Sequence, residues 1–255
     1  ALGAPAAEAA EAVSFSAAVP VWPAGRDREM NLLVEFRAGF TTAAGDSARV
    51  RVTAATIYRL RVDGRFIGSG PARAGHGVFR VDEWDLGDGL SAGSHTVTLE
   101  VAGYNCNSYA LLDQPSFLQA EVLVRGKVVA ATGSEPQAVG AVADGTKPIG
   151  FDALLRHDRV QKVQRYSFQR PFSEVWRLPG PAAELVRCEP RPPAPLLPRG
   201  VSYPAYRVRR PTAQLTGGTV ALGPVPAAPW KDRSLTGIGP ALDGFPEADL
   251  ATIPS

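Results

Sequence analysis

The chain of 255 residues is poor in cysteine, with only Cys106 and Cys188. A disulfide-rich scaffold and a four-ligand structural zinc site are therefore excluded, while one long-range disulfide or two free thiols remain open. No apolar run reaches the roughly 18–20 residues that a membrane-spanning helix needs. The first residues lack a basic stretch followed by an apolar one, so we expect a signal peptide to be absent or already removed.

Neither sign of charge dominates the sequence. The 27 lysines and arginines against 25 acidic residues leave a net charge of +2, which is too small to attract nucleic acid or an anionic membrane by bulk electrostatics. We therefore predict neither partner. Lysine is scarce, so arginine carries nearly all the positive charge and can make planar, bidentate contacts.

Long helical periodicity is missing as well, whereas glycine and proline are abundant, at 26 and 23 residues. They separate short apolar runs and form no low-complexity block, which is typical of a turn-rich β protein. Alternating or apolar runs predict strands at 31–40, 48–54, 57–62, 65–68, 78–81, 95–102, 117–124 and 127–131. Their spacing of about 8–12 residues favours an all-β, jelly-roll-like sandwich over a parallel α/β sheet.

Two dipeptides predict tight hairpins within this pattern. Asp63-Gly64 separates two alternating runs, and Arg125-Gly126 separates another pair. A type I′ turn needs a positive φ at both central residues, which glycine accepts freely and aspartate tolerates. The register of strands 57–62 and 65–68 should follow from this turn.

We predict three parts along the chain: a flexible terminus at 1–13, a sandwich over 14–145, and a smaller β-rich extension over 146–255. The proline-rich passage 188–198 in the extension is interpreted as a semi-rigid linker or an edge-covering segment, because proline lacks an amide donor and has a restricted φ. Further strands are predicted at 202–209 and 219–222.

Four passages of the sequence carry a resemblance to a known family. The first, at 58–71, combines an alternating strand, an Asp-Gly turn and a Gly-Ser-Gly-Pro loop, and the second, at 90–101, leads from a leucine and a glycine into an apolar strand. The other two passages are 104–121 and 163–172. In order and spacing these passages resemble the N-terminal β-sandwich of bacterial α-L-rhamnosidase-like glycoside hydrolases, which have six-hairpin catalytic domains. The resemblance covers about 120 residues well and 14–178 more loosely. It implies a galactose-binding-like sandwich.

In that family the sandwich precedes a large (α/α)6 barrel that carries two catalytic carboxylates. The chain has neither the length nor the helices for such a barrel, so no catalytic residue can be assigned. The resemblance implies a non-catalytic, carbohydrate-interacting or domain-packing part of a hydrolase. We expect an extracellular or periplasmic location, although a cytoplasmic one stays open. Its partners would be a glycan and a catalytic (α/α)6 domain or subunit.

Two other interpretations remain. One is a structural or protein-interaction sandwich without glycan affinity. The other, weaker one is a self-sufficient hydrolase on a β scaffold, which needs two carboxyl groups facing a cleft. The strand pattern provides no such pair.

Sugar recognition by a β-sandwich usually needs an aromatic platform beside polar groups that hydrogen-bond hydroxyls. Two loops that follow strands, 68–77 and 103–114, offer both, and we expect them to converge at one end of the sandwich. The candidate carbohydrate-binding residues are Arg73, His76, Tyr104, Asn105, Asn107, Tyr109, Asp113 and Gln114. The alternative is that the asparagines and the aspartate cap turns while the tyrosines pack in the core or on the next domain.

Other chemistry is weakly indicated. The densest acidic group comprises Asp82, Glu83, Asp85 and Asp88. We interpret these residues as solvated turn carboxylates, with a structural calcium site as the alternative. We predict no cofactor. The histidines are too scattered for a metal triad; they are His76, His95 and His157. The tryptophans are predicted to be core or domain-interface anchors; they are Trp22, Trp84, Trp176 and Trp230.

Overall fold

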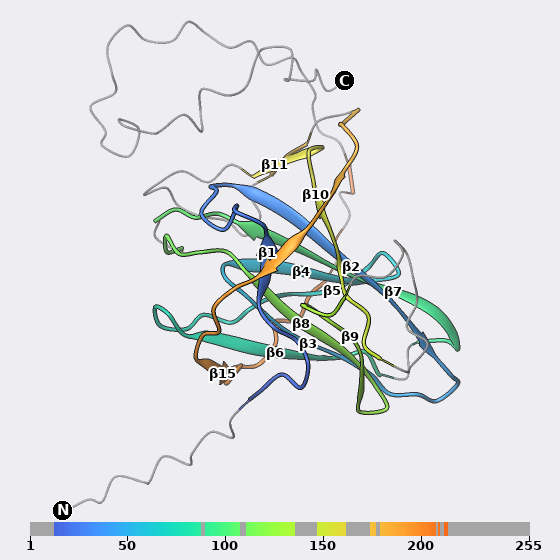
Figure 1. Ribbon diagram of the computed structural model, residues 1–255. Coiled ribbons are helices and arrows are strands. Elements are labelled where there is room, and N and C mark those ends of the chain that lie inside the picture. The colour runs from blue at the N-terminus through green and yellow to red at the C-terminus, as the bar shows by residue number, and fades with distance from the viewer. Residues whose placement is uncertain are drawn as a thin grey trace, which may run out of the picture.

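The computed structural model describes residues 13–87, 90–107, 111–135, 147–161, 174–176, 179–207, 209 and 212–213. These residues form two large β-sheets and a separate two-stranded sheet (Figure 1). The strands are β1 (Val21–Pro23), β2 (Leu32–Thr42), β3 (Ala48–Ala54), β4 (Ile57–Val62), β5 (Arg65–Gly70), β6 (Phe79–Asp85), β7 (Gly93–Gly103), β8 (Leu118–Val124), β9 (Lys127–Ala131), β10 (Asp152–Leu155), β11 (Arg159–Gln161), β12 (Glu174–Trp176), β13 (Glu184–Val186), β14 (Cys188–Pro190) and β15 (Leu196–Pro198).

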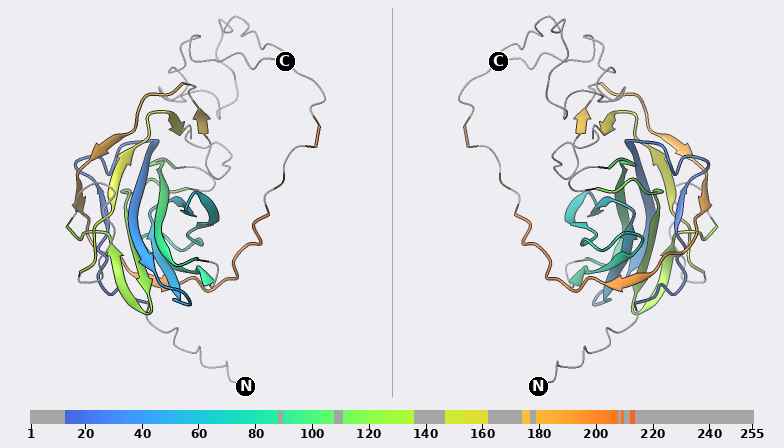
Figure 2. Two further views of the ribbon diagram at one scale, coloured as in Figure 1. Left: turned by 90° about the vertical axis from the view of Figure 1, so that its right-hand side faces the viewer. Right: turned by 90° about the vertical axis from the view of Figure 1, so that its left-hand side faces the viewer.

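The two large sheets lie face to face, as the views in Figure 2 show. One has the order β14-β1-β8-β3-β6-β15, with β9 also paired to β8, and the other has the order β13-β10-β2-β7-β4-β5. Neighbouring strands are antiparallel except β15, which runs parallel to β6. The predicted all-β sandwich is therefore confirmed.

The core lies between these sheets and follows the alternation of the strands. β2 pairs with β7 along all eleven residues, and its inward side chains Val34, Phe36 and Phe40 are fully buried. Trp22 from β1 packs on Phe36 with ring centroids 6.0 Å apart. Burial of such apolar side chains contributes about 1.5–3 kcal/mol each, so this layer is the main source of stability.

Both predicted hairpin turns are present. Asp63 and Gly64 have φ values of 50° and 75°, and Arg125 and Gly126 have φ values of 53° and 76°. Positive φ at both central residues defines the type I′ turn, whose twist matches that of the flanking strands. The turns connect β4 to β5 and β8 to β9.

Strands that follow residue 145 also join the two large sheets. β10 pairs with β2, and its Ala153 and Leu155 are buried in the shared core. β13, β14 and β15 also extend the two large sheets. Each of these three strands pairs over only three residues. Their partners therefore depend on which sheet edges are free and not on the sequence pattern of the strands themselves.

The proline-rich passage covers edges, one of its two predicted roles. Cys188–Pro190 pairs with β1, and Leu196–Pro198 pairs with β6. Proline is tolerated in edge strands because one side of the strand needs no amide donor. Residues 202–207 form no strand, and the predictions for 1–12, 163–172 and 219–222 lie outside the described residues.

Both cysteines are free thiols in the structure. Cys106 is buried in a small second cluster beside Leu33 and Tyr104. Burial, with a smaller contribution from Glu189, raises the pKa of Cys188 to about 12. The described residues include no helix with the length and apolar character needed to span a bilayer.

A buried histidine joins the first hairpin turn to the neighbouring loop. The His95 ring lies with Nδ1 2.7 Å from Asp63 Oδ2 and Nε2 2.8 Å from the Ser91 carbonyl oxygen. Burial opposes protonation, but these two acceptors outweigh it and raise the pKa of His95 above its ordinary value of 6.5. The doubly protonated ring can donate to both acceptors at once.

This arrangement predicts a pH-dependent stability. The pKa of His95 is higher in the folded than in the unfolded chain. Protonated His95 therefore contributes fully to the free energy of unfolding below the pKa of the unfolded chain, 6.5, and this contribution is lost as the pH rises through the pKa of the folded chain. We expect the Tm to fall as the pH rises above about 6.5, measured by thermal unfolding at a series of pH values. His95→Gln should flatten this slope and His76→Gln, on an exposed loop, should keep it; an unchanged slope in His95→Gln would refute the assignment.

Candidate functional site

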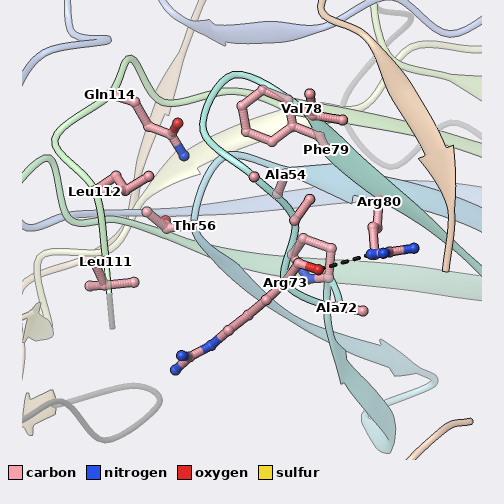
Figure 3. A pocket seen from close by; sticks show the side chains of 13 residues that line it. Ala54, Thr56, Ala72, Arg73, Val78, Phe79, Arg80, Leu111, Leu112 and Gln114 are labelled. Carbon is pink, nitrogen blue, oxygen red and sulfur yellow. Dashed lines mark hydrogen bonds between the residues drawn. The ribbon is translucent and has the colours of Figure 1, made fainter. Parts of the chain in front are cut away.

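A cavity of about 290 Å³ lies between the loop that joins β5 to β6 and the loop that joins β7 to β8 (Figure 3). The two loops that the sequence analysis singled out therefore meet at one end of the sandwich. The lining residues are Ala54, Thr56, Pro71, Ala72, Arg73, Ala74, Gly75, Val78, Phe79, Arg80, Leu111, Leu112 and Gln114. The cavity offers an apolar surface with a few polar groups, the usual composition of a small-molecule site.

The first loop is held at the start of β6. Arg80 Nε donates to the Arg73 carbonyl oxygen over 2.9 Å, the bond drawn in Figure 3. The Phe79 amide donates to the Pro195 carbonyl over 3.0 Å. The Phe79 ring also packs edge-on against Phe117, with centroids 4.7 Å apart. These contacts hold the cavity wall in place before any ligand binds, which lowers the entropic cost of binding.

The predicted binding residues separate into three groups. Arg73 and Gln114 line the cavity. His76, Asn107 and Asp113 are exposed on the same loops but do not line it. Asn107 Oδ1 accepts a hydrogen bond from the Asp113 amide over 2.9 Å, the turn-capping role that was the alternative. Tyr109 lies outside the described residues.

Tyr104 and Asn105 form the third group, because both are buried. Asn105 has a φ of 46° and donates from Nδ2 to the Glu29 carbonyl and to Ser116 Oγ, over 3.0 and 2.8 Å. Tyr104 belongs to the second cluster with Leu33 and Cys106. The expected exposed aromatic platform is therefore replaced by a structural role for both side chains.

The lining residues that sequence reasoning missed come from strand ends and from an apolar pair. Phe79 and Arg80 begin β6, and Thr56 precedes β4 with a φ of 123°. Leu111 and Leu112 lie in an otherwise polar loop, and Leu112 is 42% exposed. Exposed leucines in a polar loop were the one signal in the sequence that could have indicated this surface.

The predicted acidic cluster is dispersed, and the interpretation of Asp82 as a solvated turn residue is wrong. Asp82, Glu83 and Asp85 belong to β6, where alternation sends successive side chains to opposite faces. Asp82 is fully buried, Glu83 pairs with Arg51 over 2.6 Å, and Asp85 is exposed. Asp88 is not described. Among the described residues, no three His, Cys, Asp or Glu side chains are grouped as metal ligands.

Asp82 anchors a segment that closes the open edge of the sandwich, which we call the strap (residues 196–206). Arg199 Nη1 donates to Asp82 Oδ1 over 2.7 Å, and the Tyr58 hydroxyl donates to Oδ2. Burial raises the pKa of Asp82, and these hydrogen bonds only partly offset it. Figure 2 shows the strap running past the margin of the two sheets.

Two tyrosines continue this closure. The Tyr203 hydroxyl lies 2.7 Å from both the amide and the carbonyl of Glu83, and the Tyr203 ring packs on Trp84 at 4.3 Å between centroids. The Tyr206 hydroxyl donates to the Ser69 carbonyl on β5 over 2.7 Å. The strap thus contacts β6 of one large sheet and β5 of the other.

The tryptophans only partly follow their prediction as anchors. Trp22 and Trp84 are buried, whereas Trp176 is 51% exposed and packs over the Arg159 guanidinium at 4.6 Å. Trp230 lies outside the described residues.

The pair of carboxylates that comes nearest to a hydrolase arrangement is instead ion-paired. Glu35 and Glu100 face each other across β2 and β7 and are almost fully buried. Arg159 Nη2 lies 2.5 Å from Glu100 and 3.8 Å from Glu35, and Arg156 also pairs with Glu35. Neither glutamate lines the cavity.

Neither a family model nor a curated protein sequence matches this chain. Its architecture is similar to that of the GH78 family rhamnosidase of Bacillus sp. GL1, with a TM-score of 0.58 and 21% identity over 73% of this chain and 20% of that one. The alpha-L-rhamnosidase from Aspergillus terreus aligns with a TM-score of 0.38 and 15% identity, over 56% of this chain and 17% of that one. The Pleurotus ostreatus lectin aligns with a TM-score of 0.35 and 16% identity, over 55% of this chain and 35% of that one.

The similarity to the Bacillus structure defines this chain by its fold, a β-sandwich of the kind found in a GH78 family rhamnosidase. The resemblance read from the sequence is confirmed at that level. The chain spans about a fifth of the length of the Bacillus enzyme.

Proposed function

We propose that this chain is a non-catalytic, carbohydrate-interacting sandwich of an α-L-rhamnosidase-like glycoside hydrolase, and that the cavity between its two loops contacts the sugar. The observation that carries the proposal is the composition of that cavity. Phe79, Leu111 and Leu112 supply an apolar surface, and Gln114 and Arg73 supply polar groups beside it. A sugar ring presents an apolar C–H face and a polar rim, which such a site complements.

The similarity in fold supports the wider setting. A chain of this architecture that spans a fifth of a rhamnosidase would pack against a catalytic (α/α)6 domain or subunit and would act outside the cytoplasm, where polymeric glycans are met. The catalytic carboxylates would then belong to that partner.

A calorimetric titration with rhamnose-containing oligosaccharides tests the proposal. Gln114→Ala should weaken binding about 5- to 10-fold, because a hydrogen bond contributes on the order of 1 kcal/mol. Leu112→Ala should also weaken binding, through loss of apolar contact. Arg65→Gln, an exposed substitution on the first hairpin, is the matched control and should bind as the parent does.

Two results would contradict the proposal. Rhamnoside hydrolysis that disappears when a carboxylate of this chain is changed would show a catalytic role. Absence of binding to plant and bacterial glycans by the folded chain would favour the alternative, a protein-interaction sandwich. The exposed apolar side chains of Leu185 and Val201, at 53% and 57%, are the observation that favours that alternative.

A further inference from the structure

We propose that the cavity selects saccharides that carry a carboxylate, such as uronic acids, over neutral ones. This inference rests on the proposed function and adds the chemical class of its ligand. The observation behind it is the charge of the lining, which holds two arginines, Arg73 and Arg80, and no acidic residue.

The charge of Arg80 is oriented by its contacts but is not neutralised by them. Its Nε donates to the Arg73 carbonyl, and its Nη1 donates to the carbonyls of Pro198 and Arg199, over 2.8–2.9 Å. All three acceptors are neutral peptide oxygens, and Arg80 forms no ion pair with a described carboxylate. A guanidinium held in this way keeps its full positive charge in a partly buried position, where electrostatic attraction is stronger than in bulk water.

Arg73 adds a second positive charge at the open margin of the same cavity. Figure 3 shows its side chain extending from the loop on the side of Leu111, while Arg80 lies on the opposite side. Arg73 is exposed and makes no ion pair within the described part of the chain. Its guanidinium can therefore approach an anionic group of a bound sugar bidentately.

The acidic side chains nearest in sequence do not offset these charges. Asp82 points into the sandwich and is paired with Arg199. Asp113 is exposed on the second loop and does not line the cavity. The cavity volume of about 290 Å³ lies at the lower end of the range for small-molecule sites, roughly 300–1,000 Å³, so one charged sugar residue is the expected occupant.

Calorimetric titration of the full chain with trigalacturonate and with the same trisaccharide after carboxyl reduction tests the inference. At low salt we expect the acid to bind at least about 10-fold more tightly, as a charge-assisted bidentate pair would give. Added salt should narrow this difference. Arg73→Gln should remove most of this difference, because it should weaken binding of the acid far more than binding of the reduced trisaccharide, and Arg65→Gln should change neither.

The possible failures are distinguishable. Equal affinity for the acid and the reduced trisaccharide would overturn the inference and leave the proposed function standing. Binding of neither trisaccharide, nor of any other glycan, would overturn both. A preference for the acid that survives in Arg73→Gln and in Arg80→Gln would place the recognition elsewhere and refute the assignment to this cavity.

Discussion

Asp82→Ala is expected to lower the free energy of unfolding by about 3–5 kcal/mol, because it removes one partner of a buried ion pair. The Asp82 side chain is fully buried, and that of Arg199 is 11% exposed. After the substitution, the Arg199 guanidinium and the Tyr58 hydroxyl lose their shared acceptor. Urea unfolding followed by fluorescence measures the effect.

The matched control is Asp85→Ala, which lies on the same strand but is exposed and should change stability by no more than about 0.5 kcal/mol. Asp82→Ala should also make the strap a preferred site of limited proteolysis, because Arg199 fastens it. Equal stability of the two variants, with an uncleaved strap, would show that the ion pair does not hold this edge.

Arg159→Met has the second largest expected effect, about 3 kcal/mol, because it removes a buried guanidinium from an ion-pair network. Among the described residues, Glu100 then keeps only Arg59 and Arg61 as ion-pair partners. Arg159 lies within 2.5 Å of Glu100, and both side chains are about 5% exposed. The same guanidinium packs against Trp176 on β12. We therefore expect both lower stability and greater exposure of that tryptophan to fluorescence quenchers.

A double substitution separates the pair from simple loss of packing. Arg159→Met combined with Glu100→Leu removes both charges and should recover much of the lost stability, because a buried ion pair can be replaced by apolar side chains at little net cost. Chemical denaturation of the single and double variants gives the coupling free energy. Additive losses would contradict the electrostatic account.

The features predicted correctly from the sequence are those set by local chemistry. Asp63-Gly64 defines a turn within two residues, and the alternation of Ile57–Val62 determines which side chains are buried. Such patterns are sufficient for the central strands, since each strand there carries its own inward and outward faces.

The remaining strands depend on tertiary contacts that no local pattern encodes. β14 and β15 have three residues each and pair with β1 and β6 because those edges are free. The parallel pairing of β15 joins segments more than a hundred residues apart, which neither propensity nor turn chemistry indicates.

The candidate site shows the same division. Its two loops could be identified because turn residues and polar groups follow strands, but the direction of each side chain could not. Tyr104 points inward because it continues the buried end of β7, whereas Phe79 and Arg80 reach the cavity from the first residues of β6. A difference of one residue in register exchanges a binding group for a core residue.

Hydrogen–deuterium exchange of the full chain, with and without a saturating oligosaccharide that binds it, tests most directly whether this cavity is the contact site. The account predicts added protection at 71–80 and 111–117, with the β8–β9 hairpin at Arg125-Gly126 unchanged. Protection that appears only outside these two loops, at full occupancy of the sugar, would contradict it.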